Sequence, residues 1–184
     1  YVGYNWVPKE RRQFCWAHII RNLTRMAERG GATGMIGARL LLAALVVVRT
    51  QHRYDRGRLD PPRYRRRMKR LRGSFGRLLQ TGADDPHLRS RNACKLLLKH
   101  QLSLWTFLRY DGVPITNNRA EQCIRPYVIW RKTSFATQSH RGDQFIARIL
   151  SVVETCNTQA RSVHDFLTEL FQADYTGREL PSLV

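Results

Sequence analysis

Glu121 is the only acid in a basic stretch of the chain, residues 117–132. A carboxylate among so many cations stays ionised, and an ionised carboxylate is a good ligand for a hard metal ion. Phosphoryl transfer on DNA by two divalent ions needs several such carboxylates, and basic side chains nearby would bind the phosphates. The side chains that flank Glu121 and could contact DNA are Asn117, Asn118, Arg119, Arg125, Arg131 and Lys132.

A structural role for Glu121 is the alternative. Asn118 followed three residues later by Glu121 has the spacing of a capping box, in which the glutamate accepts a hydrogen bond from the N-cap amide. Such caps are common at helix starts, so the spacing alone favours the cap. The capped helix would be short, because Pro126 tends to end it.

Cys15 and His18 form another pair at ligand spacing, C-x-x-H. No second pair at such spacing follows, so core packing is a better interpretation than a zinc site. The four cysteines lie far apart without a C-x-x-C pair, which indicates reduced thiols in a cytosolic compartment. The remaining histidines are isolated, and no Ser/His/Asp or Cys/His catalytic set can be assembled from them.

The net charge of +18 exceeds what solubility requires and predicts a polyanionic partner, nucleic acid before an anionic membrane surface. Residues 49–77 carry twelve basic residues against two aspartates, which leaves +10 of that total. Apolar residues at steps of three and four place the arginines on one helix face, where Arg65, Arg66 and Lys69 are the predicted phosphate contacts. A charged face that is merely solvated is the alternative.

Hydrophobic periodicity predicts a chain dominated by helices, with little strand. The expected helices span 16–29, 35–50, 61–79, 93–108, 145–156 and 163–171. Asp60 and Ser162 are the expected N-caps, Gly73 and Gly76 predict a bend or break, and the tail from Asp174 should fray. Strands are expected at 11–15 and in part of 127–136.

The longest apolar run, Leu40–Val48, is about half the ~20 residues that span a bilayer. We therefore expect a core helix there and no membrane partner.

Two segments carry a resemblance to a known family. "DGVPITNNRAEQCIRPYVIWRKTSF", residues 111–135, and the "SHRG" turn at 139–142 resemble the C-terminal catalytic region of the insertion-sequence-66 family of bacterial transposases. "RRQFCWAHIIRNL", residues 11–23, resembles the segment after that family's second catalytic aspartate, and "YVGYN" at the start fits just before it. The resemblance covers nearly the whole chain.

The resemblance implies an RNase H-like core and a DDE triad of two aspartates and one glutamate, in which Glu121 is the glutamate. The two aspartates would precede Tyr1, so the chain would be a C-terminal fragment that is inactive alone. The expected fold is α/β and helix-dominated, a partial RNase H-like core with a helical insertion and its N-terminal strands missing. With this prior, metal binding by Glu121 is favoured over the cap.

The predicted regions are part of the core at 1–29, a basic helical insertion at 30–108, the C-terminal part of the core at 109–172 and a tail at 173–184. The intact protein is expected to cleave and join DNA strands with Mg²⁺ held in part by Glu121. Its partners would be transposon ends and target DNA, with a homo-oligomer in the active complex, in the bacterial cytoplasm at the nucleoid. The rival hypothesis is a non-enzymatic, basic helical DNA-binding module in which Glu121 only caps.

Overall fold

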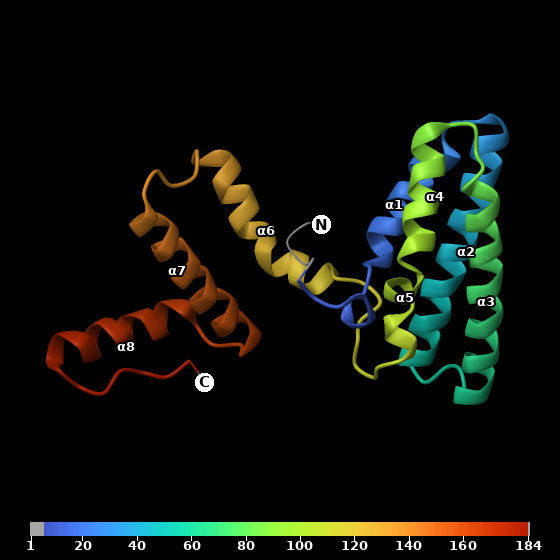
Figure 1. Ribbon diagram of the computed structural model, residues 1–184. Coiled ribbons are helices and arrows are strands. Elements are labelled where there is room, and N and C mark those ends of the chain that lie inside the picture. Colours follow the sequence, from blue (N-terminus) through green and yellow to red (C-terminus); the bar gives the residue numbers. More distant parts are fainter. Residues whose placement is uncertain (1–5, 184) are drawn as a thin grey trace. The chain divides into compact units, whose positions relative to one another are not determined.

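The computed structural model of the chain describes residues 6–183, which divide after Asn118 into two compact units (Figure 1). The "YVGYN" segment lies outside the described residues. The elements of the first unit are η2 (Lys9–Arg11), α1 (Trp16–Ala27), α2 (Gly31–Asp55), α3 (Pro61–Gly82), α4 (Leu88–Lys99), α5 (Gln101–Leu104) and η3 (Thr106–Leu108). Those of the second are α6 (Asn118–Thr133), which begins at the boundary, α7 (His140–Thr158) and α8 (Val163–Thr176).

Helices α1 to α5 form a bundle whose core is centred on Trp16. The Trp16 side chain is fully buried, its ring centroid lies 5.0 Å from that of Trp105 and 5.3 Å from that of Phe75, and its indole N–H donates to the Leu104 carbonyl at 2.9 Å. One side chain thereby joins α1, α3 and the α5 region. Trp16 and Trp105 therefore serve packing in this core.

The α1–α2 hairpin turns at Gly30 and Gly31, both with positive φ. Beyond the turn, Gly34 and Gly37 of α2 face α1 so closely that a Cβ at Gly37 would lie 2.5 Å from the backbone N of Ala27. Glycine is required at position 37 because any side chain would push the two helices apart.

Helix α3 begins as the sequence predicts, with the Asp60 carboxylate accepting a hydrogen bond from the Arg63 amide at 3.1 Å. It then runs unbroken from Pro61 to Gly82 through Gly73 and Gly76, so the predicted break is wrong. Its buried side chains, Tyr64, Met68, Phe75 and Leu79, hold it against the bundle and outweigh the low helix propensity of two glycines.

Helix α2 is longer than predicted and is apolar on most of its circumference. By length and composition it is the one helix among the described residues that could cross a membrane. Within the bundle, Leu40, Ala44 and Val47 are fully buried where α2 packs along α1 and α3, whereas Leu42 and Leu45 are exposed.

Of the predicted strand at 11–15, Arg11 ends η2, and residues 12–15 pair with no strand among the described residues. Its polar groups bind the α5 region instead: the Phe14 amide donates to the Ser103 carbonyl at 2.8 Å, and the Thr106 hydroxyl donates to the Arg12 carbonyl at 2.5 Å. These bonds give the segment the backbone partners that a neighbouring strand would otherwise supply.

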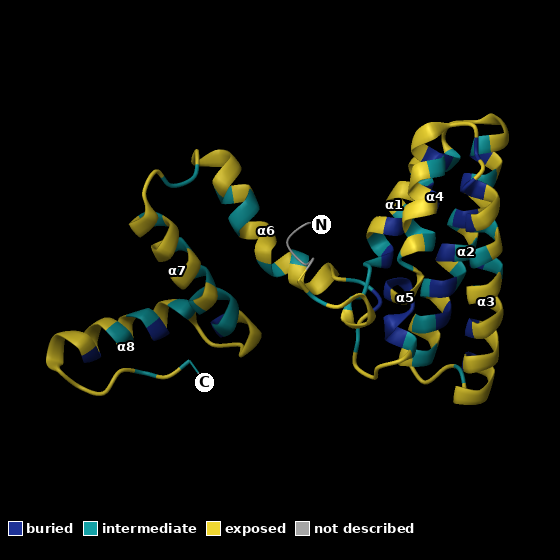
Figure 2. Cartoon of the chain, viewed as in Figure 1, coloured by how far each residue is buried: buried dark blue, intermediate teal, exposed yellow. Residues whose placement is uncertain are grey.

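The second unit has a small core. Its buried side chains are Cys156, Phe166 and Ala173, and Figure 2 shows mostly exposed and intermediate residues along α6 to α8. The Ser162 N-cap is confirmed by a 3.2 Å bond from the Asp165 amide. Helix α8 reaches Thr176, past the predicted fraying point, and Gly177 ends it in the left-handed conformation.

The α/β prediction with a partial RNase H-like core is wrong, because residues 6–183 contain no strand. The β-branched and aromatic residues at 127–130 lie inside α6, which continues through Pro126 to Thr133. A helix satisfies its backbone groups within one segment, whereas a strand needs a partner edge. The predicted division into four regions stays a prediction.

Replacing Gly37 with alanine should lower the stability of the bundle by about 2 kcal/mol, the usual cost of overpacking. Thermal unfolding followed by tryptophan fluorescence measures this, since Trp16 and Trp105 lie in the core. Gly73→Ala is the matched control, because its methyl group would meet only the Arg77 Nη1 atom, at 3.6 Å, and should raise the melting temperature. Equal effects from both substitutions would contradict the close packing of α1 on α2.

Candidate functional site

Glu121 lies in the first turn of α6 and is half-buried. The helical period places Arg125 and Lys132 on the same side of α6 as Glu121, at separations of four and eleven residues. Along the axis these residues cover about 16 Å, close to five base steps of a DNA strand. Because α6 continues past Pro126, Glu121, Arg125 and Lys132 lie on one helix. A helix that ended at Pro126 would have separated Lys132 from the other two residues.

The other DNA contacts predicted on α6 lie on different sides of the helix from Glu121. Arg119 and Arg131 are exposed but lie off the line of Glu121 by the helical period. The Arg131 guanidinium lies 5.9 Å from the ring centroid of Tyr127, and the Tyr127 and Trp130 rings are stacked at 6.1 Å. Arg131 is thereby placed beside an aromatic pair on the C-terminal half of α6.

The asparagine motif is fixed to the first unit just before α6 begins. The Asn117 amide donates to Cys15 Sγ at 3.2 Å, and the Trp16 amide donates to the Ile115 carbonyl at 3.1 Å. Asn117 and Asn118 both keep exposed positions. Nothing in the sequence signals this contact, since Cys15 and Asn117 lie 102 residues apart.

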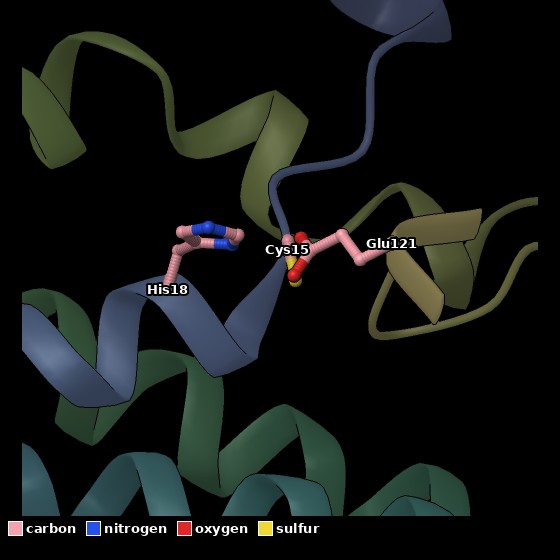
Figure 3. Close-up of side chains that lie close together, drawn as sticks. All are labelled: Cys15, His18 and Glu121. Carbon is pink, nitrogen blue, oxygen red and sulfur yellow. The ribbon is translucent and has the colours of Figure 1, made fainter. Parts of the chain in front are cut away.

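Cys15 has a role that the sequence did not indicate: it holds the chain that leads into α6. Figure 3 shows Cys15 at the approach to α1, His18 one turn further on, and Glu121 on its own helix. Sγ of Cys15 and a ring nitrogen of His18 lie within 4.8 Å of each other. This pair supplies two ligands of the three or four that a zinc site needs.

Magnesium requires several oxygen ligands in near-octahedral geometry. Glu121 is the only acid of α6, and its place in a helix's first turn also suits a carboxylate that interacts with the helix dipole. A single carboxylate does not make a magnesium site. Helix α6 can therefore supply at most one carboxylate ligand, Glu121, to such a site.

Arg65, Arg66 and Lys69 lie on α3 in the first unit, and all three are exposed. Helix α3 carries eight basic residues and no acid. At the start of α3 the Arg63 side chain forms an ion pair with the N-cap Asp60, at 3.3 Å. The predicted contacts therefore fall into two sets, one on α3 and one at and along α6.

The cysteines separate into two classes of reactivity. Burial, with a smaller contribution from Asp85, raises the pKa of Cys94 to about 11, and Cys156 is fully buried. Cys15 and Cys123 are half-exposed.

Iodoacetamide at pH 7 should alkylate Cys15 and Cys123 before Cys94 and Cys156, because only accessible thiolates react. Peptide mass spectrometry over a time course measures the four rates. In urea the rates should converge, and rapid alkylation of Cys94 in the folded chain would contradict its burial.

The model of the Transposase IS66 family matches residues 1–145. Comparisons with curated proteins and with solved structures found no match. The family match takes in both helical segments that carry the predicted DNA contacts, together with the asparagine motif and Glu121. Because it covers well over half of the chain, the chain belongs to the IS66 family of transposases.

Proposed function

We propose that this chain forms part of a DDE transposase, with Glu121 as the carboxylate that it contributes to the metal-binding triad. Transposases act on DNA, so DNA is the partner. The observation that carries the proposal is the line on α6, where one acid shares a helix side with Arg125 and Lys132. Cations so placed would bind the phosphates on either side of a reacting phosphodiester.

The magnesium chemistry of the proposal is the activation of water or a 3′ hydroxyl and the stabilisation of the leaving oxygen. This chain's own part is narrower. Glu121 would supply one oxygen ligand, Asn117 and Asn118 would position the entry to α6, and Arg125 and Lys132 would bind DNA. The remaining carboxylates would come from elsewhere in the transposase, and the chain alone would be inactive.

A second set of contacts would lie on α3, where Arg65, Arg66 and Lys69 would bind the backbone without reading sequence. We also propose a homo-oligomer in the active complex and a location at the nucleoid in the bacterial cytoplasm. The rival function is a DNA-binding module without catalysis, in which Glu121 only caps α6.

The test separates chemistry from binding. In the transposase expressed from the full reading frame, Glu121→Gln should lower strand cleavage by more than about a hundredfold, because the amide is a poor ligand for a hard cation. Binding to a duplex that carries the transposon end should change little. Cleavage on gels and fluorescence anisotropy measure the two quantities.

Glu169→Gln, on the exposed side of α8, is the matched control and should leave both quantities unchanged. Normal cleavage by Glu121→Gln would overturn the catalytic assignment and favour the rival. Loss of binding together with folding would assign Glu121 a structural role in α6.

A further inference from the structure

A hollow of about 350 Å³ opens on the solvent side of α3, within the first unit. It is lined by Arg72, Gly73, Gly76, Arg77, Gln80 and, from α5, Gln101. Gly73 and Gly76 line it with helix backbone, and the ends of the Arg77 and Gln101 side chains lie near them. The arginines and glutamines form its rim.

The glycines are unexplained by the packing of the bundle. Each costs the helix about 1 kcal/mol relative to alanine. Both have right-handed helical backbone, and an added methyl group would have room at each position: its nearest neighbours would be Arg77 Nη1 and Gln101 Nε2, both at 3.6 Å. At Gly37, by comparison, an added Cβ would overlap with the backbone of α1. The absent methyl groups at positions 73 and 76 leave helix backbone as part of the lining of the hollow.

The rim has the chemistry of an anion site. Guanidinium groups only donate hydrogen bonds, and each glutamine amide adds two donors. No acid lies on α3, and among the described residues neither Arg72 nor Arg77 forms an ion pair. Arg77 donates to the Ser74 hydroxyl at 3.2 Å, which keeps its guanidinium along the helix beside the glycines.

The hollow also continues the basic side of α3. By the helical period, Arg65, Lys69, Arg72 and Gly76 follow one another at steps of four, three and four residues. A strand of DNA along Arg65 and Lys69 would therefore reach the hollow next. Without the two methyl groups, its backbone can approach the helix more closely there than elsewhere on α3.

We propose that the hollow at Gly73 and Gly76 is a binding site for a backbone phosphate of DNA. Arg72 and Arg77 would bind the phosphate, and Gln80 and Gln101 would be further hydrogen-bond donors. The proposal rests on the proposed DNA binding and adds to it a fixed position on α3. It explains why a helix with a strongly basic exposed side carries two glycines on that side.

The first test adds two methyl groups to the lining of the hollow without changing charge. In the full chain, Gly73→Ala/Gly76→Ala should weaken binding to a labelled 30-base-pair duplex roughly tenfold, the usual effect of losing a charge-assisted hydrogen-bonded contact. The same substitutions should raise the melting temperature, because alanine favours the helix. Weaker binding by a more stable protein cannot be attributed to unfolding.

A second variant removes charge. Arg72→Gln/Arg77→Gln should reduce the slope of log affinity against log salt by about 1.8, if each arginine releases a counterion from one phosphate. The matched control is Arg89→Gln/Lys95→Gln on α4, which removes the same charge from exposed positions away from the hollow. It should change the slope less.

The outcomes are distinguishable. If the unmodified chain shows no salt-dependent binding to the duplex, the proposed function fails. If it binds and the double alanine variant binds equally well, the proposed phosphate-binding site is contradicted, whereas DNA binding by the chain remains supported. Phosphatidylglycerol vesicles are the remaining probe: weaker vesicle binding with unchanged DNA binding would assign the hollow to a lipid headgroup and overturn the proposal.

Discussion

The burial of Trp16 is the interaction on which the first unit depends. Its ring packs against Trp105 and Phe75, and its two N–H groups bind the Leu104 and Ile115 carbonyls. These contacts join the start of α1 to a segment about ninety to one hundred residues later. The loop that leads into α6 is thus held by the centre of the hydrophobic core, and the position of the asparagine motif follows from packing.

Much of the helical structure could be predicted from the sequence, because its causes are local. Asp60 and Ser162 cap their helices as expected, and apolar residues at helical spacing locate the buried side of α3. The strands could not be predicted correctly, because strand formation depends on a partner. Residues 11–15 have strand-like composition, but their backbone partners lie in the α5 region.

The candidate site was predictable in its residue types and not in its geometry. Glu121 is identifiable as the only acid in a basic segment. That it shares a helix side with Lys132 depends on α6 passing through Pro126, where local propensity predicts an end. The contact of Cys15 with Asn117 joins distant parts of the chain, and the hollow on α3 needs Gln101 from another helix.

Pro126 gives α6 a property that a regular helix lacks. Proline has no amide hydrogen, so the carbonyl oxygen of Gln122, four residues earlier, receives no hydrogen bond from within the helix. Gln122 is exposed, so its carbonyl can accept a hydrogen bond from water or from a donor on a ligand.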